Sequence, residues 1–242
     1  MAGPAISRLG AMTTVARAAT SLIASPRPIL FLDTCALLDI VRAPYRGSIG
    51  TVRASLELKA LATVGTVQLF VQDIVPQEWS DNLAAARRDG DLGVQAFTTT
   101  WEIAADLGLP APPLPALPPG SLIDELERLS RDLLQASDTL DRDYDGMSLA
   151  LDRVAAKLKP SSKNGTVKDC HILGHAIQVS TLLGRGYPKS RVLVSSNRSD
   201  FAAPNSTVFH PDIARDAAVA GLGYAISLEA AIAELRVAGD IA

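Results

Sequence analysis

Short apolar runs alternate with longer amphipathic segments along this chain, which is the pattern of strands interleaved with helices. Two runs, PILFLD at 28–33 and TVQLFVQDIV at 66–75, are rich in Ile, Leu, Val and Phe and predict buried strands. A third run, RVLVSS at 191–196, predicts another strand. Because helical patterns separate the runs, we expect an α/β fold, a three-layer sandwich with a mainly parallel central sheet.

Helical periodicity fills most of the chain between these strands. Pro76 is well placed at the first position of a helix that continues to about residue 107. Two weaker strands are predicted at 206–210 and 223–227. The other predicted helices cover residues 34–42, 53–63, 121–136, 146–158, 167–183, 212–218 and 228–237.

Two segments fall outside this α/β pattern. The stretch 107–121 contains six prolines, which excludes a helix interior and predicts a stiff polyproline connector. We therefore expect a single domain over 28–242 with a Pro-rich and helical insertion at about 108–160. Residues 1–27 contain three arginines and no acid, and are interpreted as a disordered N-terminal extension. A transit peptide and a true start at Met12 are the alternatives.

The composition is that of an ordinary globular protein. The chain has 242 residues, 48% hydrophobic and 20% charged, which is enough for a core without disulfides or structural metals. Its two cysteines are expected to be reduced thiols, which favours a cytoplasmic location. No segment approaches the ~20 apolar residues of a membrane span, so no membrane partner is expected. The net charge of −3 requires any basic surface to be local.

Acidic and amide side chains follow the predicted strands. Asp33 ends the first strand, Glu78 begins the helix after the second, and Asp169 begins the helix before the third. Asn197 and Asp200 come just after that third strand. Because the carboxyl ends of parallel strands share one edge with the following helix N-termini, we expect these side chains to converge.

Carboxylates held together repel one another and raise each other's pKa unless cations neutralise them. Hard oxygen ligands with open positions suit Mg²⁺ or Mn²⁺. Such ions activate a water molecule and stabilise the leaving oxygen at a phosphodiester. The acids therefore predict an enzyme, a metal-dependent nuclease. There are simpler alternatives for each acid. Asp33 and Asp169 could be helix N-caps, and Glu78 could be a first-turn acid stabilised by the helix dipole.

The order of LDTCALLDI, VPQEW, KDCHILGHAI and VSSNRSDF resembles the PIN domain over about 28–108 and 160–215. That family has an α/β nuclease fold, and many members are ribonucleases, including the toxins of toxin–antitoxin pairs. The resemblance implies an endoribonuclease that uses Mg²⁺ or Mn²⁺, with Asp33, Glu78, Asp169 and Asp200 as catalytic acids and metal ligands. Asn197 stands where the family often has Asp, so either Asn197 or Asp200 is the fourth ligand. Thr34 and Ser195 would support the acids through their hydroxyl groups.

Basic residues near these acids predict contacts with RNA phosphates. Lys163 and Lys168 precede Asp169 in a run without acids, and Arg198 follows Asn197. The sequence leaves open a protein partner or a homo-oligomer.

Several other functions stay open. One is a catalytically weak or inactive PIN-like module that binds RNA or a protein. A phosphatase of the haloacid-dehalogenase type also begins with an Asp after its first strand, but Cys35 occupies the position of its second Asp. His171 and His175 have the i, i+4 spacing of zinc ligands without the Glu of a metalloprotease motif.

Overall fold

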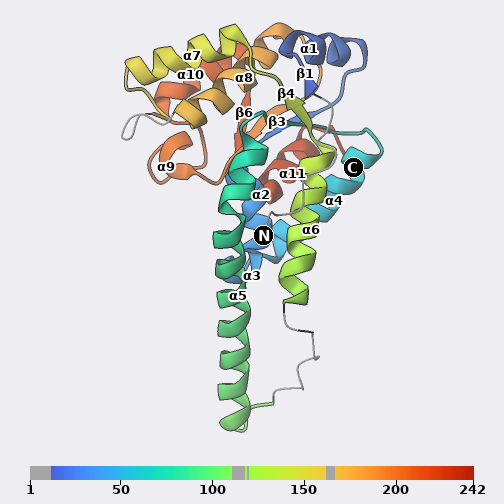
Figure 1. Ribbon diagram of the computed structural model, residues 1–242. Helices are drawn as coiled ribbons and strands as arrows, with labels where there is room; N and C mark the ends of the chain where they lie inside the picture. Colours follow the sequence, from blue (N-terminus) through green and yellow to red (C-terminus); the bar gives the residue numbers. More distant parts are fainter. Residues whose placement is uncertain (1–11, 111–117, 119, 162–166) are drawn as a thin grey trace.

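One six-stranded parallel sheet forms the centre of the protein (Figure 1). The computed structural model describes residues 12–110, 118, 120–161 and 167–242. The sheet order is β1-β4-β3-β2-β5-β6, and every pair of neighbouring strands is parallel. The predicted three-layer α/β architecture is confirmed. The strands are β1 (Met12–Thr13), β2 (Ile29–Leu32), β3 (Gln68–Gln72), β4 (Asp138–Leu140), β5 (Arg191–Val194) and β6 (Gly223–Ala225).

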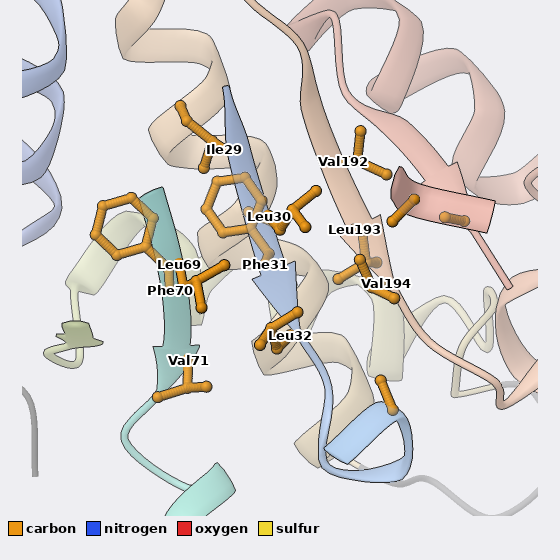
Figure 2. Packing of buried hydrophobic residues seen from close by; sticks show 14 of the residues in the cluster. Ile29, Leu30, Phe31, Leu32, Leu69, Phe70, Val71, Val192, Leu193 and Val194 are labelled. Carbon is orange, nitrogen blue, oxygen red and sulfur yellow. The ribbon is translucent and has the colours of Figure 1, made fainter. Parts of the chain in front are cut away.

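The three apolar runs form the middle of the sheet and are buried on both faces. Phe31 of β2 pairs with Phe70 of β3 on one side and with Leu193 of β5 on the other. The rings of Phe31 and Phe70 stack with centroids 5.8 Å apart (Figure 2). Continuous apolar strands of this kind need helices over both faces of the sheet.

Two groups of helices cover the sheet. α2, α4, α6 and α11 pack against one another, and α8 packs against α1, α7 and α10. The second half of α5 extends beyond the body of the molecule (Figure 1). The helices are α1 (Val15–Ala24), α2 (Thr34–Val41), α3 (Ala43–Arg46), α4 (Ile49–Thr63), α5 (Val75–Asp106), α6 (Ser121–Ala136), α7 (Tyr144–Ala155), α8 (Val167–Leu183), α9 (Arg198–Phe201), α10 (Pro211–Ala220) and α11 (Leu228–Val237).

The structure corrects the expected boundaries of the domain. Residues 12–27 are folded, since β1 pairs with β4 and α1 packs on α8, whereas residues 1–11 lie outside the described residues. The segment 121–155 supplies α6, β4 and α7, and β4 lies between β1 and β3 within the sheet. This segment is therefore part of the core fold rather than an insertion added to it.

Two further expectations concern loops. The strand predicted at 206–210 is wrong: this stretch forms only an isolated bridge between Ala202 and Phe209. The predicted polyproline connector falls largely on residues 111–117 and 119, which lie outside the described residues. Within the described part of the chain, no helix has both the length and the apolar character required to cross a membrane.

A buried hydrogen-bond relay fixes the helix that carries Glu78. The indole N–H of Trp79 donates to Ser130 Oγ at 2.9 Å, and the Ser130 hydroxyl donates to the carbonyl of Leu37 at 2.7 Å. Trp79, Ser130 and Leu37 belong to α5, α6 and α2 and are all buried. Because buried polar groups without partners are costly, this relay holds the start of α5 in one position against α2.

Candidate functional site

A cleft of about 320 Å³ opens at the carboxyl edge of the sheet, beyond β2, β3 and β5. Five residues of the predicted site line it: Asp33, Thr34, Glu78, Asp169 and Asn197. They come from the junction of β2 and α2, the first turns of α5 and α8, and the loop after β5. Four of the five side chains that were expected to converge at one sheet edge therefore line this cleft, and Asp200 does not.

Asp33 is the buried centre of the cleft. Its side chain makes no capping hydrogen bond to α2, although Asp33 is the residue that precedes the helix. Instead, Asp33 Oδ2 accepts hydrogen bonds from Ser195 Oγ at 2.6 Å and from Cys35 Sγ at 2.9 Å. The expected supporting role of Ser195 thus has a direct geometric basis, and the N-cap alternative does not explain this carboxylate.

The electrostatic environment raises the pKa of Asp33. Burial is the main cause, and the negative charge of Glu78 adds to it. The hydrogen bonds from Cys35, Ser195 and the backbone of Thr34 lower the pKa and offset part of the effect. A bound cation would stabilise the ionised form of Asp33. It would therefore offset the free-energy cost of ionising a buried carboxyl group beside a second acid.

Glu78 is held from both sides. Its Oε2 accepts a hydrogen bond from Thr34 Oγ1 at 2.9 Å, and its Oε1 lies 2.9 Å from Lys168 Nζ. The Glu78 side chain is only 16% exposed, whereas that of Lys168 is 56% exposed. Lys168 therefore neutralises the charge of Glu78, while the Lys168 side chain itself remains largely exposed to solvent.

Asn197 and Asp200 have different positions. Asn197 lines the cleft, and its Nδ2 donates to Asp200 Oδ2 at 3.0 Å. Asp200 does not line the cleft, and its other oxygen forms an ion pair with Lys159 Nζ at 3.1 Å. Of the two candidates for the fourth ligand, Asn197 therefore lines the cleft. Asp200 lies outside the cleft and orients the Asn197 side chain through the hydrogen bond between them.

The three predicted contacts with nucleic acid divide in a similar way. Lys163 lies outside the described residues. Lys168 stands beside the cleft through its ion pair with Glu78. Arg198 is exposed but does not line the cleft, and its guanidinium donates to the carbonyl of Ser206 at 3.0 Å.

Sequence reasoning missed other residues of the cleft, including Arg42, Arg46 and Asn82. Arg42 Nε forms an ion pair with Asp89 at 2.9 Å, and Arg46 Nη1 one with Asp39 at 2.8 Å. Asn82 lies one helical turn after Glu78, so the i, i+4 spacing was a usable signal for it. The two arginines lie beyond the LDTCALLDI motif, and no local pattern connects them to the acids.

Cys35 and the two histidines have structural roles here. Burial and the neighbouring Asp33 raise the pKa of the Cys35 thiol well above its usual value, so the thiol stays protonated and donates to Asp33. Burial, with His175 nearby, lowers the pKa of His171 to about 4. His175 Nε2 accepts from the backbone N–H of Asp143 at 3.0 Å, and its Nδ1 lies 3.0 Å from the carbonyl oxygen of His171, so both ring nitrogens are already engaged.

The donor chemistry of the cleft fits a hard divalent cation. Asp33, Glu78 and Asp169 supply carboxylate oxygens, and Asn197 supplies an amide oxygen. Across the described residues, however, no three His, Cys, Asp or Glu side chains stand close enough together to form a metal-binding group. In addition, Glu78 Oε1 is engaged by Lys168. A metal ion at Glu78 Oε1 would have to displace that ammonium group.

Searches for similar proteins give no guide to the function: no family model, curated protein or solved structure matches the chain. The residues of the cleft therefore carry the functional argument.

Proposed function

We propose that the protein is a metal-dependent endoribonuclease that hydrolyses RNA phosphodiester bonds in this cleft. One observation carries the proposal: Asp33, Glu78 and Asp169 come from three separate parts of the chain and line one cleft at the carboxyl edge of a parallel sheet. Their order along the chain also underlies the resemblance to the PIN domain, which remains part of the proposal.

Asp33, Glu78 and Asp169 would hold Mg²⁺ or Mn²⁺, with Asn197 as a neutral fourth oxygen ligand. The bound ion would supply Lewis acidity for activating water and stabilising the leaving oxygen. The Ser195 hydroxyl and the Cys35 thiol fix the orientation of Asp33, and Thr34 fixes that of Glu78. These donors orient Asp33 and Glu78, whereas metal binding would still require Lys168 to leave Glu78.

Phosphate groups of the RNA would contact the basic residues beside the acids. Lys168 is mostly exposed, and Arg42 and Arg46 line the cleft. With Glu78 holding the metal, the Lys168 ammonium group would be available to bind a phosphate on the same side of the cleft. Lys168 would thus have two alternative anionic partners. It pairs with Glu78 when no substrate is bound, and it would pair with a phosphate when RNA is bound.

A second function is an RNA-binding module without cleavage. The ion pair between Lys168 and Glu78 favours it, because it neutralises an acid that a nuclease needs for metal binding. Asn197 favours it as well, because an amide adds no negative charge to the site. The two functions share the same surface and differ in whether the cleft takes up a metal ion.

The test is cleavage of a labelled single-stranded RNA pool with Mn²⁺, with Mg²⁺ and with EDTA. The parent protein is compared with Asp33→Asn and Asp169→Asn, and with Asp152→Asn as a control on an exposed acid that does not line the cleft. The nuclease predicts cleavage that requires metal, disappears in both cleft variants and persists in the control. Absence of cleavage under every condition, with RNA binding retained, would support the binding module instead.

A further inference from the structure

A second cavity lies at the opposite edge of the sheet from the cleft. It has a volume of about 260 Å³ and is bounded by α1 and by the first residues of β3 and β4, Gln68 and Asp138. Since the strands are parallel, these amino-terminal ends are on the far side of the sheet from Asp33, which follows the last residue of β2. The cavity is therefore separate from the candidate nuclease site.

Two arginines without acidic partners line this cavity, Arg17 and Arg27. Neither guanidinium forms an ion pair with any acid in the part of the chain that the structure describes. The Nε of Arg27 is buried and lacks a hydrogen-bond partner among these residues. A buried donor without an acceptor is costly, and a guanidinium is shaped to bind a carboxylate or phosphate through two hydrogen bonds.

The backbone of Arg27 is fixed beside the cavity by two hydrogen bonds. Its N–H donates to Tyr187 Oη at 3.0 Å, and the Tyr187 hydroxyl donates to the Arg27 carbonyl at 2.7 Å. This reciprocal pair anchors the residue just before β2 to the segment just before β5. A ligand that bound Arg27 would therefore meet a residue whose main chain is already ordered.

The remaining walls define what else the ligand must carry. Asp138 places a carboxylate in the cavity, and its Oδ2 accepts a hydrogen bond from Gln68 Nε2 at 3.0 Å. Phe70 and Leu22 form an apolar part of the lining and are almost fully buried. A ligand with only negative charge would be repelled by Asp138, so a group that donates hydrogen bonds or carries positive charge must accompany the anion.

We propose that this cavity binds a small organic molecule that combines an anionic group with a hydrogen-bond donor. The anionic group binds Arg17 and Arg27, the donor binds Asp138, and an apolar part rests against Phe70 and Leu22. Two sources share this chemistry: a nucleoside monophosphate, with its phosphate and base amino group, and a free amino acid, with its carboxylate and ammonium group. The volume of about 260 Å³ lies just below the usual range of small-molecule sites, so the ligand must be small.

The experiment is isothermal titration of the full chain with 5′-mononucleotides, with amino acids and with inorganic phosphate. The parent protein is compared with Arg17→Gln, Arg27→Gln and Asp138→Asn, and with Arg215→Gln as a control on an exposed arginine remote from the cavity. Binding of one organic class is expected, weaker binding of phosphate alone, and a loss of affinity of about tenfold in each arginine variant but not in the control.

Folding of the variants is checked by urea unfolding. Arg17 is exposed, so Arg17→Gln keeps the test valid even when Arg27→Gln fails to fold. Asp138→Asn separates the two sources, because it should weaken an amino acid, with its full positive charge, more than a mononucleotide. The proposal is overturned when neither class binds at millimolar concentration, or when binding is unchanged in Arg17→Gln.

Discussion

Replacing Asp33 by asparagine is expected to make the protein more stable in the absence of metal ions. Asp33 is 4% exposed, and the pKa of its carboxyl group is raised, chiefly by burial. Asparagine has nearly the same volume and keeps an oxygen acceptor, but it brings no charge into the core. The change therefore removes a cost of folding without opening a cavity.

The magnitude follows from the contacts of Asp33. Burial of an ion costs several kcal/mol, and the donors Ser195, Cys35 and the Thr34 backbone offset part of that cost. Because the pKa is raised, burial outweighs the donors, and we expect a net gain of about 1–2 kcal/mol for Asp33→Asn. For a chain of this size, each kcal/mol corresponds to roughly 2–4 °C in Tm.

The gain should depend on pH in a defined direction. A carboxyl group whose pKa is raised on folding stabilises the protein below its unfolded pKa of 3.8, and this stabilisation is lost as pH rises through the folded value. The Asp33→Asn variant has no titrating group at this position, so its stability does not fall in this way as the pH rises. Its advantage over the parent should therefore be small near pH 4 and larger at neutral pH.

The assay is urea unfolding in EDTA from about pH 4 to pH 8, a range over which the native state must persist. Asp152→Asn, which changes an exposed acid, serves as the matched control and should leave the unfolding midpoint nearly unchanged. The reasoning is refuted if Asp33→Asn is no more stable than the parent at neutral pH, or if its advantage shrinks as the pH rises.

Three further predictions concern the site and the fold. Lys168→Met should raise the Mn²⁺ affinity of the cleft roughly two- to fivefold, because the metal ion no longer competes with the Lys168 ammonium group for Glu78. The size of the effect follows from the ion pair, since an exposed pair is worth at most about 1 kcal/mol. Unchanged affinity in a Mn²⁺ titration would contradict this. Leu140→Ala should lower the free energy of unfolding by about 2–5 kcal/mol, since Leu140 is fully buried in a strand inside the sheet, and a smaller loss in urea unfolding would contradict the placement of β4. Gly174→Ala should cost more than about 2 kcal/mol, since its Cβ would stand 2.4 Å from the carbonyl oxygen of Gly146 where α7 crosses α8; a Tm equal to that of the parent would show that the helices separate easily.

The parts of the fold that could be predicted are those with long patterns. β2, β3 and β5 are largely apolar runs of four or five residues, all of them buried. β1 and β4 are two and three residues long, so neither is long enough to show an alternating pattern. Their place in the sheet depends on pairing across more than 100 residues, which no local signal specifies.

The same distinction between local and long-range signals applies to the residues of the candidate site. Asp33, Glu78 and Asp169 were predictable because the ends of parallel strands and the starts of their helices share an edge. The positions of Asp200 behind Asn197 and of Lys168 on Glu78 were not, because they depend on side-chain distances between separate elements. The place of Arg17 and Arg27 in the second cavity was not predictable, because it depends on the packing of α1 and of the segment before β2 against β3 and β4.

The central claim is that the carboxylates of the cleft take up a divalent cation for phosphodiester hydrolysis, and Mn²⁺ binding followed by electron paramagnetic resonance tests it most directly. The parent protein should bind Mn²⁺, Asp33→Asn and Asp169→Asn should each lose this binding, and Asp152→Asn should retain it. Binding of the metal should also stabilise the parent against urea, by about 2.7 kcal/mol at a hundred times the Kd. Equal Mn²⁺ binding in all four proteins, or none in the parent, would contradict the account.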